Sequence, residues 1–165
     1  HGSVLHDRHI EPSVPGASAV AALFVNEFDR DLPRVALPRP EMHVVARFGP
    51  QTQDGLDVHV LGVGERVHRK LIRRGHRMVM ARLRLGAHEA VLTAPATAVA
   101  GRVVALDALW GDAAVRRLRE RLACARNLTE AANVLERAIA DRAMRSADHD
   151  EMRANLVRAA AARLP

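Results

Sequence analysis

The sequence is short of aromatic residues and of cysteine, and each shortage excludes a class of protein. Its aromatic side chains are three phenylalanines and one tryptophan, too few for the stacking platforms that hold single-stranded nucleic acid. Its single cysteine, Cys124, excludes an internal disulfide and a cysteine-based zinc cluster. Hydrophobic residues still make up 48% of the 165-residue chain, so one globular domain with an aliphatic core is expected.

The sequence also lacks a run that is long and apolar enough to span a membrane, and no signal-peptide pattern opens it. We therefore expect a cytoplasmic protein that makes no membrane contact. The opening residues His1, Gly2 and Ser3 look like the remnant of an expression tag, so they predict nothing about the fold.

Lysine is nearly absent, although the chain is strongly basic. The net charge is +6 and the isoelectric point is about 11.2, which would suit a nucleic-acid partner. Lys70 is the only lysine, however, and the arginines are scattered among aspartate and glutamate along the chain. This distribution favours a solvated surface over a phosphate-binding track.

The first two thirds of the chain carry the pattern of short strands. Residues 1–18, which include Pro12, Pro15 and Gly16, show little periodicity and predict a mobile lead-in. An apolar run at 19–28 is followed by a turn-rich stretch at 29–40. Apolar and polar residues then alternate in four runs separated by glycine and proline: 41–48, 56–61, 66–73 and 77–85. Strands at this spacing predict a small antiparallel barrel or sandwich.

Beyond Gly86 the hydrophobic period becomes helical. The pattern predicts helices at 87–92, 113–125, 128–144 and 148–164. Asn127 is a favourable N-cap for the third of these, and Glu130 completes a capping-box pattern. Cys124 falls on the apolar side of the second helix and is expected to be buried.

The apolar stripes of these helices allow two interpretations. Val115, Leu118 and Leu122 have the spacing to cover a barrel. A second stripe has the spacing either to continue that cover or to form an antiparallel helix pair between subunits: Val134, Leu135, Ala138 and Ile139. We expect a homodimer through helices 113–144.

Segment 55–111 carries an ordered set of motifs. A strand-ending glycine, Gly62 or Gly64, precedes the pattern R-x-x-x-x-R-L-R at 77–84, and Gly86 then opens a short helix. The phrase V-x-L-x-x-L-W-G follows at 104–111. In this order the motifs resemble the N-terminal domain of AraC-type bacterial transcription regulators, over roughly residues 41–145. One departure is Leu85 before Gly86, where that family usually has proline.

The resemblance implies an α+β fold, a cupin-like antiparallel β-barrel followed by C-terminal helices. It implies a sensor barrel at 19–110, a dimerisation or packing segment at 111–145, and a linker helix at 146–165 towards a DNA-binding domain outside this chain. Such a domain reads the major groove with helix-turn-helix motifs, and this sequence contains none. The expected function is therefore that of a regulatory domain that senses a small-molecule effector, and DNA is expected as a partner only through the further domain.

No catalytic constellation is visible, so we expect no enzyme, no cofactor and no metal site. None of the nine histidines forms the His-x-His pair that metal-binding cupins use. His59 and His68 are the pair most able to converge across strands, but surface or hydrogen-bonded histidines are the commoner case. No serine lies in a nucleophile elbow, and Gly62 and Gly64 lack the rest of a phosphate loop.

The basic run at 66–74 is the candidate ligand site, and two interpretations of it stay open. Its inward-pointing arginines would hold an anionic effector, or its charges would simply keep an edge strand soluble. The predicted ligand-binding residues are Arg69, Arg73 and His59. The alternatives to a regulator are a stand-alone cupin-like small-molecule-binding protein and a metal-dependent cupin enzyme that uses His59, His68 or His76.

Overall fold

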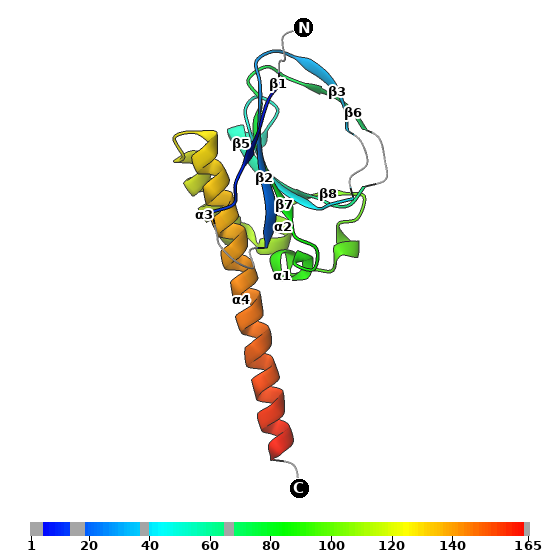
Figure 1. Cartoon of the computed structure of the whole chain (residues 1–165), viewed down its shortest axis with the longest axis vertical. Coiled ribbons are helices and arrows are strands. Elements are labelled where there is room, and N and C mark those ends of the chain that lie inside the picture. Colours follow the sequence, from blue (N-terminus) through cyan, green and yellow to red (C-terminus); the bar gives the residue numbers. More distant parts are fainter. Residues whose placement is uncertain (1–4, 14–18, 37–39, 65–67, 164–165) are drawn as a thin grey trace.

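The protein has an α+β fold, as expected: an antiparallel sheet of six strands is followed by helices that end in one long C-terminal helix. The computed structural model describes residues 5–13, 19–36, 40–64 and 68–163. Figure 1 shows the helices α3 and α4 on one side of the sheet, and the strands β3 and β6 on the other.

The six-stranded sheet has the order β1-β2-β7-β4-β5-β8, and β3 pairs only with β6. The strands are β1 (Leu5–Ile10), β2 (Val20–Phe28), β3 (Leu32–Ala36), β4 (His43–Phe48), β5 (Leu56–Leu61), β6 (His68–Ile72), β7 (Arg77–Leu83) and β8 (Val103–Ala105). The helices are α1 (His88–Leu92), α2 (Asp107–Trp110), α3 (Asp112–Ala123) and α4 (Leu128–Ala162), with single 3-10 turns at Gln53–Gly55 and Ala96–Ala98.

Two strands lie where the sequence predicted none. β1 falls inside the expected lead-in; it is an edge strand that pairs only with β2, so its residues need no clean alternation. β3 contains Pro33 and pairs on one side only, with β6. A proline is tolerated there because an edge strand leaves half of its N–H groups outside the ladder. Tertiary pairing, rather than local pattern, therefore creates both strands.

One face of the large sheet forms the hydrophobic core together with the helices. Leu23 on β2, Val44 on β4 and Ala81 on β7 are almost completely buried on this face. From the helices, Val115, Leu118, Leu122, Leu135 and Ile139 pack into the same cluster. α4 contacts β2, β7 and α1, and α3 contacts β5. The core is aliphatic, as the composition requires.

Trp110 holds the junction between the sheet and the helices. Its indole Nε1 donates a hydrogen bond of 2.8 Å to the carbonyl oxygen of Val91 at the end of α1. The guanidinium of Arg142 on α4 lies 5.3 Å from the centre of the indole ring, a cation-π distance. Burial, with a smaller effect of Arg145, lowers the pKa of Arg142 below its usual value. Gly111 has a φ of 88°, which favours glycine and lets the chain turn from α2 into α3.

α4 is one continuous helix of 35 residues, whereas the sequence pattern predicted two helices with a break near residues 145–147. That stretch reads Arg-Ser-Ala and contains no glycine or proline, so nothing interrupts the backbone hydrogen bonds. At 1.5 Å per residue the helix is about 50 Å long, and its second half extends away from the sheet (Figure 1). No helix in the described part of the chain has both the length and the apolar character to cross a membrane.

Asn127 caps this helix, as predicted. Its side-chain oxygen accepts a hydrogen bond of 2.9 Å from the backbone N–H of Glu130. The Glu130 carboxylate accepts from the backbone N–H of Arg126 at 2.8 Å and also pairs with the Arg126 guanidinium. This ion pair lowers the pKa of Glu130 and raises that of Arg126.

Replacing Asn127 with alanine is expected to lower the free energy of unfolding by about 1 kcal/mol, because the cap hydrogen bond is lost. Urea denaturation followed by circular dichroism measures the change. Asn127→Asp is the control, since aspartate is an equally good N-cap and should keep most of the stability. Equal stability of the alanine variant and the wild type would show that the cap contributes nothing.

Candidate functional site

The large sheet has a second face that is largely buried but carries polar side chains. We call it the polar face and define it by the alternate residues that the helices do not cover: Ala22, Phe24, Asn26, His43, Val45, Arg47, Asp57, His59, Leu61, Met78, Met80 and Arg82. None of them belongs to the aliphatic cluster under the helices. The two faces of one sheet therefore have different chemistry.

Strand register arranges the polar face in three rows. The first row runs Asn26, Met78, Arg47, Asp57 across β2, β7, β4 and β5. The middle row runs Phe24, Met80, Val45, His59. The third row runs Ala22, Arg82, His43, Leu61. Charged groups thus lie at both ends of the face, and the middle row between them contains apolar side chains and the imidazole of His59.

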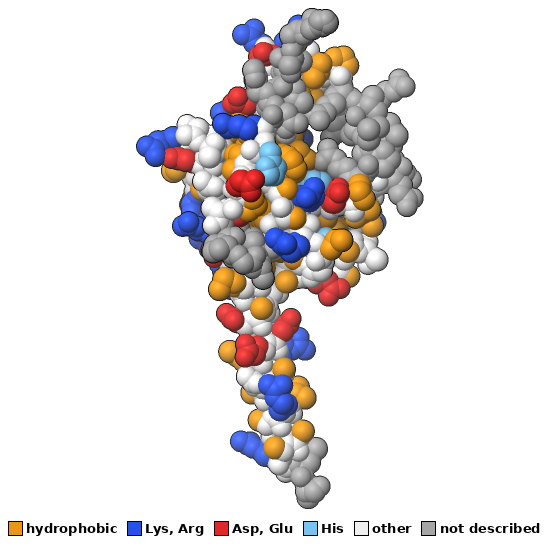
Figure 2. Space-filling view, viewed as in Figure 1, with side chains coloured by type: hydrophobic (Ala, Val, Ile, Leu, Met, Phe, Trp, Pro, Cys, Tyr) orange, Lys and Arg blue, Asp and Glu red, His pale blue; other side chains and the backbone are white. Residues whose placement is uncertain are grey.

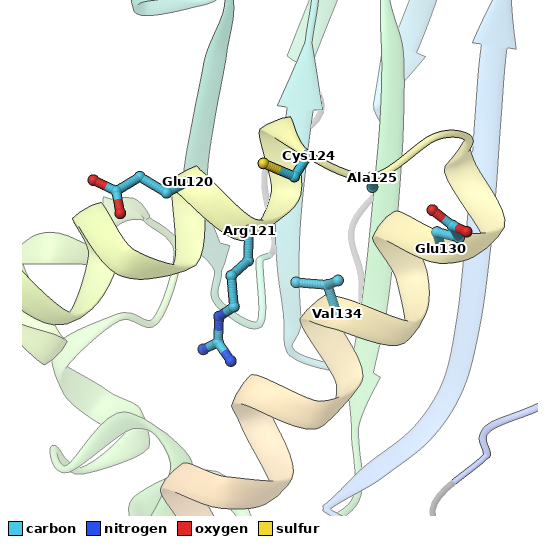
Figure 3. Close-up of a pocket in the computed structure, with 6 residues that line it drawn as sticks. All are labelled: Glu120, Arg121, Cys124, Ala125, Glu130 and Val134. Atoms are coloured by element: carbon cyan, nitrogen blue, oxygen red, sulfur yellow. The ribbon is translucent and has the colours of Figure 1, made fainter.

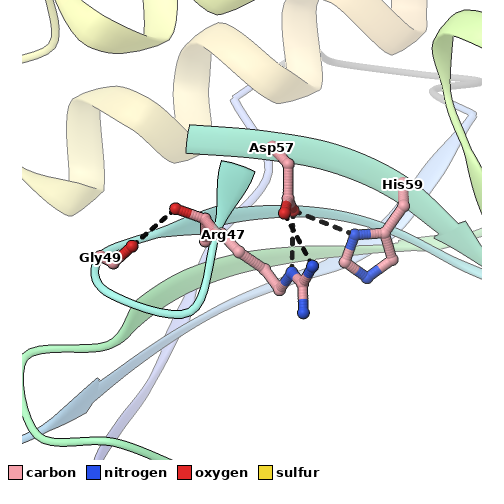
Figure 4. Close-up of polar contacts among 5 residues, drawn as sticks. Arg47, Gly49, Asp57 and His59 are labelled. Carbon is pink, nitrogen blue, oxygen red and sulfur yellow. Dashed lines mark hydrogen bonds and ion pairs between the residues drawn. The ribbon is translucent and has the colours of Figure 1, made fainter. Parts of the chain in front are cut away.

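The first row contains a half-buried ion pair (Figure 4). Arg47 donates from Nε to one carboxylate oxygen of Asp57 at 2.8 Å and from Nη2 to the other at 2.7 Å, a bidentate contact. The Nδ1 atom of His59 lies 3.4 Å from the same carboxylate. Burial by itself would raise the pKa of Asp57, but the hydrogen bonds and charge of Arg47, together with His59, outweigh it and the pKa is lowered.

Asp57→Asn is expected to lower the free energy of unfolding at neutral pH by about 1–2 kcal/mol, because the charge-assisted hydrogen bonds to Arg47 are weakened. Since the pKa of Asp57 is lower in the folded than in the unfolded chain, this contribution is fully present above the unfolded value. It is lost as the pH falls below about 4 and passes through the folded value. Denaturation curves between pH 2.5 and 7 measure the effect.

The control for this prediction is Asp54→Asn, which removes an exposed carboxylate from the turn between the same two strands. Its stability should follow that of the wild type at every pH. A stability difference between Asp57→Asn and wild type that stays constant down to pH 2.5 would contradict the assignment to the lowered pKa.

Several polar groups of this region are more deeply buried than the sequence suggested. The exposed fractions are 6% for His43, 8% for His59 and 2% for His76, which lies just before β7 with its ring 6.0 Å from that of Phe28. Asn26 is also buried. Surface or hydrogen-bonded histidines were expected, and these three are of the buried kind, because the polar side of each strand faces protein rather than solvent. Within the described residues, no three histidine, cysteine or acidic side chains are grouped to hold a metal ion.

The three predicted ligand residues lie in different places. His59 is on the polar face. Arg73 is exposed after β6, and its guanidinium pairs with Asp31 at 3.4 Å while its backbone N–H donates to Gln51. Arg69 lies in β6 opposite Val35, but its side chain is outside the described part, as is the whole of Arg66. The joint site of Arg69, Arg73 and His59 thus stays a prediction, and Arg73 is engaged at the surface.

Sequence reasoning missed Arg47, Asp57 and Arg82. The signal for the first two was present, because Gly49-Pro50 and Asp54-Gly55 mark a turn between two alternating runs. Pairing those runs as a hairpin places Arg47 opposite Asp57. Arg82 required the order of the strands, since β7 comes later in the chain but inserts between β2 and β4.

Cys124 is exposed, so the prediction of a buried thiol is wrong. It follows the last residue of α3, where Leu122 already occupies the inward position. With Glu120, Arg121, Ala125, Glu130 and Val134 it lines a shallow groove of about 370 Å³ between the end of α3 and the start of α4 (Figure 3). The groove is open and mostly apolar.

Comparison with protein-family models, with curated proteins and with solved structures finds no match for this chain.

Proposed function

We propose that this chain is the regulatory domain of an AraC-type DNA-binding transcription regulator and that it binds a small-molecule effector on the polar face. The observation that supports this best is the chemistry of that face, where buried imidazoles, an amide and an ion pair alternate with Val45 and Met80. Small-molecule sites combine apolar lining with a few placed polar groups in this way.

The proposal includes a finer description of the fold. Hydrogen bonding in the described part of the chain gives two separate sheets. We infer that β3 and β6, which lie on the side of the large sheet away from α3 and α4 (Figure 1), complete a small cupin-like barrel around the polar face. The order of motifs in segment 55–111 supports the same architecture.

A displacement caused by binding on the polar face could reach the helices through the strands of the large sheet. β2 carries Phe24 and Asn26 on the polar face, and Leu23 and Val25, which alternate with them, lie in the core. α4 packs against β2 and β7 from the other side. A ligand that shifts these strands would therefore change how α4 lies on the sheet, because a close-packed core transmits small displacements.

The sequence that the gene encodes after Pro165 tests the regulator assignment. We expect roughly a hundred further residues with two helix-turn-helix patterns, and specific binding of the full-length protein to DNA near its own gene. A stop codon directly after Pro165 would contradict the assignment. It would favour the alternatives, a stand-alone cupin-like small-molecule-binding protein or a metal-dependent cupin enzyme, which measurement of bound metal would distinguish.

We also propose that the protein forms a homodimer, through a different part of the helices from the one expected. Leu135, Ala138 and Ile139 are buried in the core of their own chain, and Val134 is half-buried. The exposed apolar side chains lie further along α4: Met144, Met152, Leu156 and Val157. Figure 2 shows hydrophobic side chains among charged ones on this extended part of the helix.

The charge pattern of distal α4 (residues 147–162) favours an antiparallel second copy. Asp148, Asp150 and Glu151 come first, and Arg153 and Arg158 follow. An antiparallel partner places acidic residues opposite basic ones, whereas a parallel partner places like charges together. Met152 and Leu156, four residues apart on one face, lie at the centre of such a pair and are 63% and 65% exposed in the single chain.

Sedimentation equilibrium tests the dimer. We expect a dimer at tens of micromolar wild-type protein and a monomer for Leu156→Asp, which places a charge in the centre of the pair. Asp150→Arg with Glu151→Arg should weaken association at low salt, and adding Arg153→Glu with Arg158→Glu should restore it. A wild-type chain that stays monomeric at 100 micromolar would overturn this part of the proposal.

A further inference from the structure

Arg82 is a half-buried cation for which the described residues provide no counter-ion. On the polar face, Arg47 is neutralised by Asp57. Arg82 lies at the opposite end and makes no hydrogen bond or ion pair within the part of the chain that is described. Glu41, two residues before His43, makes no ion pair with it. Partly removing a guanidinium from water without pairing it is costly, so the position favours an anion.

The neighbours of Arg82 suit an anionic group. Register places it directly opposite His43 on β4 and Ala22 on β2. Side chains directly opposite in an antiparallel pair have Cβ atoms about 5 Å apart, so the buried imidazole lies beside the guanidinium. On the other flank of Arg82, Ala22 is buried and presents only a methyl group. A guanidinium fork matches the two oxygens of a carboxylate or phosphate.

The rest of the polar face indicates what the anion is attached to. Met80 and Val45 form the middle row beside Arg82 and His43, and Leu61 extends the third row. These side chains are apolar, and the first two are almost fully buried. Because so little of Val45 and Met80 is exposed, an apolar body whose charged end lies at Arg82 would have to displace the side chains that cover them. The pattern is therefore a cationic end followed by an apolar floor.

We propose that the polar face binds a small organic anion, with the carboxylate or phosphate held by Arg82 beside His43 and the apolar body over Met80 and Val45. The inference rests on the proposed effector-binding role and specifies the chemical class of the effector. It places the anion at the opposite end of the face from the Arg47–Asp57 ion pair, and in a different sheet from Arg69.

Calorimetry and thermal unfolding at constant ionic strength test the site with butyrate, hexanoate, hexyl phosphate and inorganic phosphate. Hexanamide is the matched neutral ligand, since it has the length of hexanoate without its charge. We expect hexanoate to raise the unfolding midpoint and hexanamide to leave it unchanged. Each further buried CH2 should tighten binding about fourfold, and comparison of hexanoate with hexyl phosphate identifies the preferred head group.

Arg82→Gln should weaken binding of hexanoate by about 10- to 100-fold, as expected for loss of a charge-assisted pair. Arg116→Gln, which removes the same charge from the exposed side of α3, is the control and should bind like the wild type. Arg82→Lys keeps the charge without the fork and should bind with intermediate affinity, so it serves as the decisive variant if Arg82→Gln does not fold.

Three results would overturn the proposal: equal binding of hexanoate and hexanamide, equal binding of hexanoate to wild type and Arg82→Gln, or no binding of any anion in the series. Binding of neutral ligands alone would overturn the anion assignment and leave the sensing role intact. If hexanoate binds through Arg82 but the gene encodes no helix-turn-helix motifs, the anion site stands and the assignment as a transcription regulator is contradicted.

Discussion

Replacing Gly62 with alanine is expected to lower the free energy of unfolding by at least about 3 kcal/mol. A Cβ atom on this residue would lie 1.8 Å from the carbonyl oxygen of Val99, and both partners of the overlap belong to the backbone. The backbone N–H of Gly62 also donates a hydrogen bond of 3.1 Å to Arg102, so the two segments cannot separate without losing that bond. Guanidinium chloride denaturation measures the loss.

Gly64→Ala is the matched control, because it is the same substitution two residues further along. A Cβ atom there would approach no atom closer than 3.9 Å, and the backbone conformation does not require glycine. Its stability should lie within about 0.5 kcal/mol of the wild type. Equal effects of the two substitutions would show that the contact between residues 62 and 99 is not tight in solution.

Replacing Leu135 with alanine is expected to destabilise the protein by about 2–5 kcal/mol. Leu135 lies on the part of α4 that crosses the sheet, and its side chain is completely buried in the aliphatic core. The substitution removes buried apolar surface and leaves a cavity that the surrounding side chains fill only partly. Because this core contains few aromatic side chains, each leucine contributes a large share of its contacts.

Leu156→Ala is the control on the same helix, with the same change of side chain at an exposed position. In dilute protein it should change stability by less than about 0.5 kcal/mol. In concentrated protein it should also lose stability, because the proposed dimer buries Leu156 and association stabilises the folded state. A large effect of Leu156→Ala in dilute protein would mean that distal α4 packs within its own chain.

Local pattern was a sufficient guide for several elements of this fold. The alternating runs at 41–48, 56–61 and 77–85 correspond to β4, β5 and β7, since each of these strands presents an aliphatic side to the core. The helical period after Gly86 likewise anticipated α1 and α3, and Asn127 marked the first turn of α4. Burial of one face of a strand or helix requires apolar residues at regular spacing, and this spacing is visible in the sequence.

Other elements show no regular spacing of apolar residues in the sequence. β1 and β3 are edge strands, which tolerate irregular patterns and proline. β1 pairs with the next strand in the chain, β2, and β3 pairs with the more distant β6. The continuity of α4 through residues 145–147 depends on the absence of a breaker rather than on an apolar stripe, and Arg145 and Ala147 are exposed.

By itself the sequence determined the class of the protein: a single aliphatic core, an antiparallel sheet followed by helices, and no disulfide. It did so because composition and periodicity depend on which residues are buried. Every second residue of β5 and of β7 is buried in the core, so aliphatic residues recur at that spacing along the strand. It also singled out His59 as a candidate ligand residue.

Only the tertiary structure determined which side chains are neighbours on the polar face. Arg82 meets His43 because β7 inserts between β2 and β4, although it comes later in the chain than both; only the Arg47–Asp57 pair follows from a local hairpin, between β4 and β5. Alternation specifies the side of a strand on which a residue lies, but strand order and register specify its neighbours, and these follow from long-range pairing. The order and register of the strands therefore determine the candidate site, whereas the alternation of apolar residues in the sequence already indicated the core.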